Sequence, residues 1–142
     1  RRRVAASPKP GSPRDPRRVA ERLARLAARV VRWERARRTR IELTLLDATA
    51  MRRLNRRVTG RRGLTDVISF TLPQPDGRVL GDVYLCPEVA HRQPDAPTEL
   101  IRLAVHGTLH VLGYDHPVGA GRTRSSMWRR QERYVRRLVG RG

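Results

Sequence analysis

The stretch TELIRLAVHGTLHVLGYDH, residues 98–116, holds three of the four histidines of this chain. It predicts a helix from about Thr98 to Leu112. Gly113 ends that helix, because glycine readily adopts the left-handed conformation found just past helix ends. The first two histidines fall inside the helix, and the third follows the glycine. The stretch therefore predicts a helix whose last turns and following loop are built around one site.

The spacing of these histidines predicts a metal centre. His106 and His110 are four residues apart, so both imidazoles project from one helix face, about 6 Å apart along the axis. Their Nε2 atoms can converge on one ion at roughly 2.0–2.1 Å, and the turn at Gly113 allows His116 to join them. Three imidazoles favour zinc, although nickel or copper also bind such a set. We expect one Zn²⁺ per chain, with its fourth position open to water as in catalytic sites.

The same histidine spacing occurs in metzincin proteases, in which a glutamate follows the first histidine and acts as the base. Gly107 occupies that position here. A zinc protease without this glutamate has no group to take the proton from the attacking water. A peptidase is therefore disfavoured. The remaining histidine, His91, lacks the spacing of a ligand, and we expect it at the surface.

The charge of the chain indicates the kind of partner. Lys and Arg number 32 against 13 Asp and Glu over 142 residues, which leaves +19. Residues 1–40 hold 15 basic and 3 acidic groups, or +12, and residues 41–142 hold 17 and 10, or +7. Such an excess favours a polyanion, nucleic acid before an anionic membrane surface. An arginine-biased genome accounts for arginine in place of lysine but not for the shortage of acids.

Length and cysteine content limit the class of protein. A chain of 142 residues is expected to form one domain with a core that needs no disulfide. The single cysteine, Cys86, excludes an internal disulfide and fits a reducing compartment. No apolar run approaches the roughly 20 residues that span a bilayer. We therefore expect a cytoplasmic protein that does not enter a membrane.

The rest of the chain predicts an α+β domain. Residues 1–15 read as a disordered basic arm, and residues 16–142 as the folded domain. A helix starts at Asp15-Pro16, a cap residue followed by a first-turn proline. Other helices are expected over residues 48–56 and 125–139, and strands over 41–46, 65–70 and 79–86, the last two paired as a hairpin. We expect a small mixed sheet covered by helices, with the histidine site at the end of one helix.

The motif HGTLHVLGYDH, residues 106–116, closely resembles the signature of the YbeY family of single-strand-specific endoribonucleases, also called rRNA maturation factors. The resemblance continues, in the family's order, through Leu54-Asn55, TDVISF at residues 65–70 and LGDV at residues 80–83. Met127 and Glu132 are similar to the family's last helix. Together these segments place about residues 17–140 within the resemblance.

The resemblance implies a zinc-dependent endoribonuclease that acts in rRNA maturation, notably at the 3′ end of 16S rRNA, and in ribosome quality control. It implies rRNA precursors as substrate and the ribosome or its small subunit as partner. His106, His110 and His116 would be the zinc ligands. Many family members have an arginine at the position of Thr59 in this chain.

A mechanism follows as a hypothesis. Zinc lowers the pKa of a bound water toward about 7 and polarises a phosphate oxygen. Arg57, Arg61 or Arg62, in the loop at residues 57–62, would stabilise the charge that develops on phosphorus. Asp115 is the candidate base or orienting group, and a turn-forming role for it is an equal alternative.

Two other functions stay open from the sequence. One is a non-enzymatic module that binds RNA or the ribosome and contains structural zinc. The other is a zinc hydrolase that acts on a small molecule or a peptide. The missing glutamate and the basic composition disfavour the second.

Overall fold

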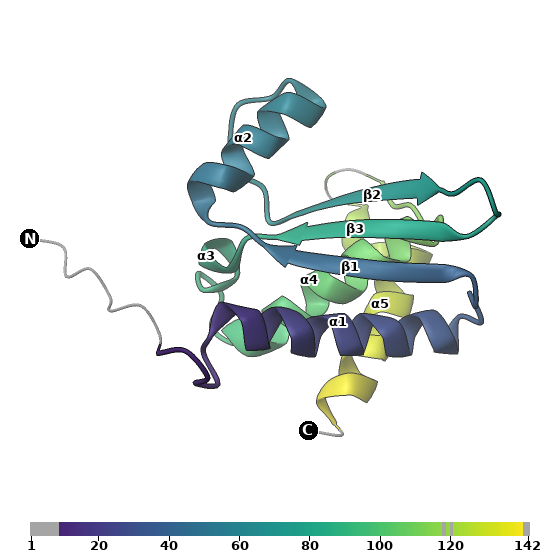
Figure 1. Ribbon diagram of the computed structural model, residues 1–142, viewed down its shortest axis with the longest axis horizontal. Helices are drawn as coiled ribbons and strands as arrows, with labels where there is room; N and C mark the ends of the chain where they lie inside the picture. The colour runs from purple at the N-terminus through teal and green to yellow at the C-terminus, as the bar shows by residue number, and fades with distance from the viewer. Residues whose placement is uncertain (1–8, 118, 120, 141–142) are drawn as a thin grey trace, which may run out of the picture.

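The computed structural model describes residues 9–117, 119 and 121–140. Its elements, in chain order, are α1 (Pro16–Trp33), β1 (Thr39–Leu45), α2 (Ala48–Thr59), β2 (Val67–Pro73), β3 (Val79–Leu85), α3 (Pro87–Ala90), α4 (Ala96–Val111), η1 (Arg122–Arg124) and α5 (Ser126–Val139). The short η1 is a single 3-10 turn. This mixture of helices and one sheet confirms the predicted α+β class (Figure 1).

The sheet has three strands in the order β1-β3-β2. β2 and β3 pair antiparallel, with Phe70 opposite Asp82, so the predicted hairpin is confirmed. β1 pairs parallel with β3, with Leu43 opposite Val83, so the sheet is mixed as expected. Because two parallel strands cannot be joined by a tight turn, the chain passes through α2 and β2 before it returns as β3.

The core lies on one face of this sheet. α4 packs against β2 and β3, α1 lies along β1 and contacts α4, and α5 packs on α4. Figure 1 shows α4 and α5 behind the sheet. On β1 the exposed residues Arg40, Glu42 and Thr44 alternate with partly buried ones, so the opposite face of this strand meets solvent. The helix α4 is therefore the central element of the core, and ten of its 16 residues are buried.

The start of α1 follows from its first residues. The Asp15 side chain accepts a hydrogen bond from the Arg17 amide at 3.0 Å, and a proline occupies the first turn, as the sequence predicts. Of the basic arm expected over residues 1–15, residues 1–8 lie outside the described residues. Residues 9–15 form hydrogen-bonded turns that lead into the Asp15 cap.

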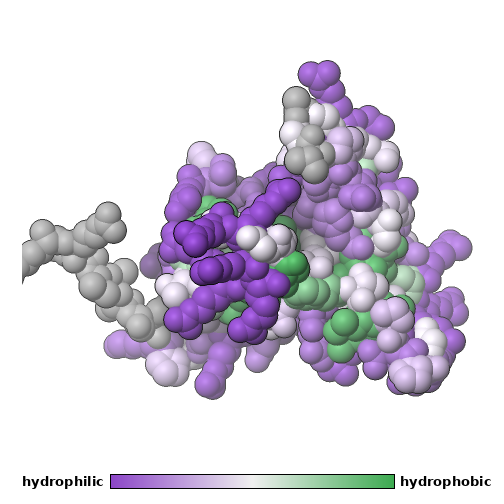
Figure 2. All heavy atoms as spheres, turned by 90° about the horizontal axis from the view of Figure 1, so that it is seen from above, coloured by the Kyte–Doolittle hydropathy of each residue, from purple (hydrophilic) through white to green (hydrophobic). Residues whose placement is uncertain are grey.

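The helix α2 makes few contacts with the other elements and stands apart from the helices behind the sheet (Figure 1). Asp47 caps its start by accepting from the Ala50 amide at 2.8 Å. Met51 is its buried anchor. Seen from above, where α2 lies, the surface consists largely of hydrophilic side chains (Figure 2). They include exposed arginines of α2, namely Arg52, Arg53, Arg56 and Arg57.

Two further observations concern the cysteine and the length of the helices. Cys86 is free and buried at the end of β3. Among the residues that the structure describes, no helix is both long and apolar enough to cross a membrane.

Candidate metal centre

The helix α4 approaches the sheet closely at Gly107. A Cβ at this position would lie 2.6 Å from Val83 Cγ1 and 3.0 Å from Ser69 Oγ, closer than real side chains pack. The Ser69 hydroxyl donates to the Gly107 carbonyl at 3.2 Å. Position 107 therefore faces the sheet, and the glutamate that a metzincin carries there would have no room.

The end of α4 has the geometry that the sequence predicts. Gly113 has φ +97°, in the left-handed region. Its amide donates to the His110 carbonyl at 3.0 Å, and the Tyr114 amide donates to the Leu109 carbonyl at 3.0 Å. These two bonds form a Schellman motif, which ends a helix and turns the chain back. This turn returns His116 to the last turns of the helix.

The three predicted histidines lie together. His110 Nε2 is 3.0 Å from His106 Nε2, and His116 Nε2 is 3.3 Å from His106 Nε2. One ligand atom from each residue lies within 4.8 Å of the others. Two nitrogens bound to tetrahedral zinc at about 2.0–2.1 Å stand roughly 3.3–3.4 Å apart. The donor set therefore fits a metal ion of this kind.

Each imidazole makes a hydrogen bond through its other nitrogen. The Nδ1 atoms donate to oxygen acceptors: His106 to Gln131 Oε1 at 2.6 Å, His110 to the Tyr114 carbonyl at 3.0 Å, and His116 to the Pro117 carbonyl at 2.9 Å. Since an oxygen acceptor requires the hydrogen on Nδ1, each Nε2 keeps its lone pair. All three lone pairs are thus available at the point where the Nε2 atoms meet. Such hydrogen bonds behind the ligands fix ring orientation in metal sites.

Gln131 is held in the orientation that His106 needs. Its side chain is 1% exposed, and its Nε2 donates to Glu132 Oε2 at 3.2 Å. Because a carboxylate only accepts, the amide nitrogen faces Glu132 and the amide oxygen faces His106. Arg102 in turn holds Glu132 through three hydrogen bonds of 3.0–3.1 Å and Glu99 through one of 2.6 Å. Packing of α5 on α4 therefore orients the first histidine.

Burial lowers the pKa of two of the histidines, His106 and His110. The pKa of His106 is lowered from 6.5 to about 4, first by burial, while the hydrogen bond to Gln131 opposes the shift and the charges of His110 and Arg122 add to it. Burial also lowers the pKa of His110, and the charge of His116 lowers it further. Neutral imidazole is the form that binds metal, so at neutral pH these two rings are ready to act as ligands.

The other predicted site residues lie as follows. Asp115 is exposed, and its Oδ1 accepts from the His116 amide at 2.8 Å, so it shapes the turn that carries the third histidine. Arg57, Arg61 and Arg62 are exposed at the end of α2 and in the loop after it. No hydrogen bond within the described part of the chain joins these arginines to the histidines. Their role as phosphate-binding residues stays a prediction.

Sequence reasoning missed two residues at this centre, Gln131 and Arg122. Gln131 could have been found from the sequence, because it lies on the same face of α5 as the buried residues Met127, Val135 and Leu138. A polar residue at a core position needs a partner there. Arg122 could not have been found from the sequence, because nothing in its irregular segment distinguishes it from the many other arginines. Only its position in space, where its charge acts on both His106 and His110, distinguishes it.

Comparison with known proteins agrees with the fold. The solution structure of TM1509 from Thermotoga maritima is similar with a TM-score of 0.61. The similarity covers 95% of this chain and 87% of that chain. The two sequences share 24% identity, so this similarity concerns the fold alone.

Sequence comparison identifies the family. "Endoribonuclease YbeY" of Micrococcus luteus is 38% identical in an alignment of length 117, and the match covers 73% of this chain and 73% of that relative. The protein of that name from Mycolicibacterium smegmatis is 40% identical over 92 residues, and the alignment spans about half of that relative, 52% of its length. The sequence model of the family described as Endoribonuclease YbeY matches residues 12–139. This chain belongs to the endoribonuclease YbeY family.

Proposed function

We propose that this chain is a single-strand-specific endoribonuclease that depends on one Zn²⁺ per chain and acts in rRNA maturation. One observation carries the proposal. Three Nε2 atoms meet at one point, with His106 Nε2 at 3.0 and 3.3 Å from the other two, and every Nδ1 donates to an oxygen. Such a set favours zinc and leaves a fourth position for water.

The family and the charge support RNA as the substrate. The relatives are named as endoribonucleases, which hydrolyse phosphodiester bonds in RNA. The formal charge of +19 suits a polyanion. The lack of room for a side chain at Gly107 removes the general base of a related peptidase site. RNA hydrolysis therefore agrees with the family, the charge and the site together.

Each group of the chain has a proposed task. Zinc, when bound, would act as a Lewis acid and would lower the pKa of the water bound to it toward about 7. His106, His110 and His116 would hold it. Asp115 remains the candidate base, through the carboxylate oxygen that the His116 amide does not use. The loop arginines of residues 57–62 would neutralise charge on the phosphate.

The cellular setting is part of the proposal. An rRNA precursor, with 16S rRNA cut at its 3′ end, is the proposed substrate, and the ribosome or its small subunit the proposed partner. The free, buried thiol of Cys86 fits a reducing compartment, so we propose a cytoplasmic location.

The test separates RNA binding from RNA cleavage. The wild-type chain should cut single-stranded RNA, lose this activity in chelator and regain it with added zinc. His106→Ala removes a ligand without changing the basic surface, so it should bind RNA within a few-fold of wild type and no longer cut it. His91→Ala, which removes an exposed histidine away from the cluster, is the control and should cut normally. Equal cleavage by wild type and His106→Ala would overturn the proposal.

The loop arginines are tested separately. Arg57→Ala, Arg61→Ala and Arg62→Ala should slow single-turnover cleavage more than Arg22→Ala, which removes an exposed arginine of α1. Rates of all three variants equal to that of Arg22→Ala would remove the loop from the mechanism and leave the zinc site untouched.

A further inference from the structure

Arg122 lies in the η1 turn between the third histidine and α5. Its amide donates to the Gly119 carbonyl at 3.1 Å, and its carbonyl accepts from the Ser125 hydroxyl at 2.8 Å. The preceding Gly121 lies against Pro117, whose side chain a Cβ at residue 121 would meet at 3.4 Å. The backbone of Arg122 is thus fixed beside the loop that carries His116.

The side chain of Arg122 is a partly buried cation that has no anionic partner among the residues the structure describes. Its Nε is buried and makes no hydrogen bond. Within the described residues, salt bridges engage Arg78, Arg102 and Arg130 but not Arg122. A buried polar group without a partner is costly, and a buried charge more so. An anion arriving at this point would remove that cost.

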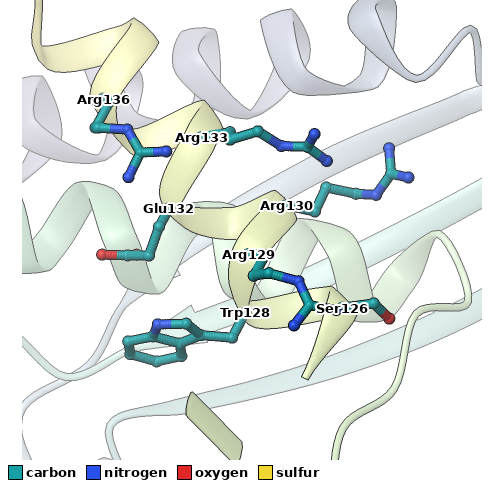
Figure 3. Close-up of a pocket in the computed structure, with 7 residues that line it drawn as sticks. All are labelled: Ser126, Trp128, Arg129, Arg130, Glu132, Arg133 and Arg136. Carbon is teal, nitrogen blue, oxygen red and sulfur yellow. The ribbon is translucent and has the colours of Figure 1, made fainter. Parts of the chain in front are cut away.

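Trp128 lies next to this cation. The guanidinium carbon of Arg122 is 6.0 Å from the centre of the indole, at the outer limit of a cation–π contact. The indole also borders a hollow of about 460 Å³ on the surface of α5, which Arg129, Arg133 and Arg136 line as well. Figure 3 shows these side chains along α5, with Trp128 near its beginning. Aromatic rings beside arginines are the usual surface for unpaired nucleotides.

The other tryptophan provides a contrast. The ring of Trp33 is stacked on Tyr134 at 5.4 Å and has the guanidinium of Arg137 at 4.0 Å from its centre. It belongs to the contact between α1 and α5, and it does not line the hollow beside Trp128. Of the two indoles, Trp128 is therefore the one placed to receive a base.

We propose that Arg122 and Trp128 form a nucleotide subsite beside the metal centre, in which the guanidinium binds a backbone phosphate of single-stranded RNA and the indole stacks on the adjoining base. The strand then continues along the arginines that line the hollow on α5. This inference rests on the proposed function, because it names the path by which RNA reaches the histidines. It gives the preference for single strands a physical basis, since a base inside a duplex is not free to stack on an indole.

Matched arginine variants test the phosphate contact. The metal-loaded protein is titrated with a 2′-O-methyl oligonucleotide of eight adenosines, and binding is followed by anisotropy. Arg122→Gln should weaken binding about 10- to 100-fold, the range expected for hydrogen bonds to a charged group. The slope of log affinity against log salt should fall by about 0.7, one phosphate contact. Arg124→Gln removes an exposed arginine of the same turn and should stay within about twofold of wild type. Equal affinities for the two variants would overturn the subsite.

Tryptophan fluorescence tests the stacked base and does not depend on activity. Binding of the oligonucleotide should quench the emission of wild type and of Trp33→Phe. In Trp128→Phe the residual emission should stay unquenched while anisotropy still reports binding, because phenylalanine can also stack. Quenching of equal size in Trp128→Phe would overturn the assignment. Zinc content measured on every variant reports whether the fold and the metal centre are intact.

The two proposals fail in different ways. A wild-type chain that cuts single-stranded RNA while Arg122→Gln binds and cuts as well as Arg124→Gln refutes the subsite and leaves the proposed function standing. A wild-type chain that neither binds nor cuts single-stranded RNA refutes the proposed function and the subsite with it.

Discussion

Replacing Gln131 by leucine should weaken metal binding without touching a ligand. Gln131 Oε1 accepts from His106 Nδ1 at 2.6 Å, and this bond fixes both the ring orientation and the nitrogen that carries the hydrogen. Leucine keeps the approximate volume at a position that is 1% exposed but offers no acceptor. The Nδ1–H of His106 would then be buried without a partner.

The expected size of the effect follows from what such hydrogen bonds contribute in metal sites. Loss of a hydrogen bond behind a metal-ligating histidine costs about 10- to 100-fold in metal affinity. This corresponds to about 1.4–2.7 kcal/mol at 25 °C. The metal-free chain should also lose about 1–3 kcal/mol of folding stability from the unpaired Nδ1–H. Part of this loss is offset, since leucine buries apolar surface where the amide was.

The assay is competition for zinc against a chromogenic chelator of known affinity, at pH 7.5. Val135→Ala is the control, because Val135 is buried on the same helix face and its aliphatic side chain cannot form a hydrogen bond to a histidine. It should lower the melting temperature of the metal-free chain through lost packing but leave zinc affinity unchanged. Zinc affinity of Gln131→Leu equal to that of wild type would refute the role assigned to this hydrogen bond.

Four further predictions concern the same centre. The purified chain should contain about one zinc, His110→Ala should lose it and His91→Ala should keep it, as measured by elemental analysis. No transition metal after purification without chelator would contradict the site. Gly113→Val should weaken zinc binding, because φ +97° costs a β-branched residue at least about 1 kcal/mol. Gly113→Asn should lose less zinc affinity, because asparagine tolerates positive φ and a Cβ at this position would meet nothing within 4 Å. Gly107→Ala should lower the melting temperature, because its methyl group would lie 2.6 Å from Val83 Cγ1. The metal-free chain should lose stability as pH falls from about 6.5 to about 4, because the unfolded chain protonates His106 near 6.5 and the folded chain only near 4. The loss of folding stability from this histidine reaches about 3 kcal/mol below pH 4. Urea titrations at several pH values measure it, and His106→Gln should lose less stability than wild type over the same pH range.

Local sequence determined the parts of the fold that depend on neighbouring residues. The His106–His110 pair, the helix end at Gly113 and the Asp15 cap were all predictable, because helix periodicity and backbone conformation act over a few residues. The hairpin of β2 and β3 follows from two β-rich runs around a turn. Element boundaries differed by at most three residues, since end residues depend on hydrogen bonds to their surroundings.

Only the tertiary structure decided what surrounds the histidines. Gln131 lies 25 residues after His106 in sequence, and its amide reaches the imidazole because α5 packs across α4. Likewise, nothing in the sequence distinguishes Arg122 from the other arginines, and only the position of η1 in the fold brings it close to the three histidines. No local pattern specifies such contacts, because their free energy arises only when distant segments meet. The sequence alone therefore determined which three histidines come together, and the packing of α5 decided which groups orient them and which cation lies beside them.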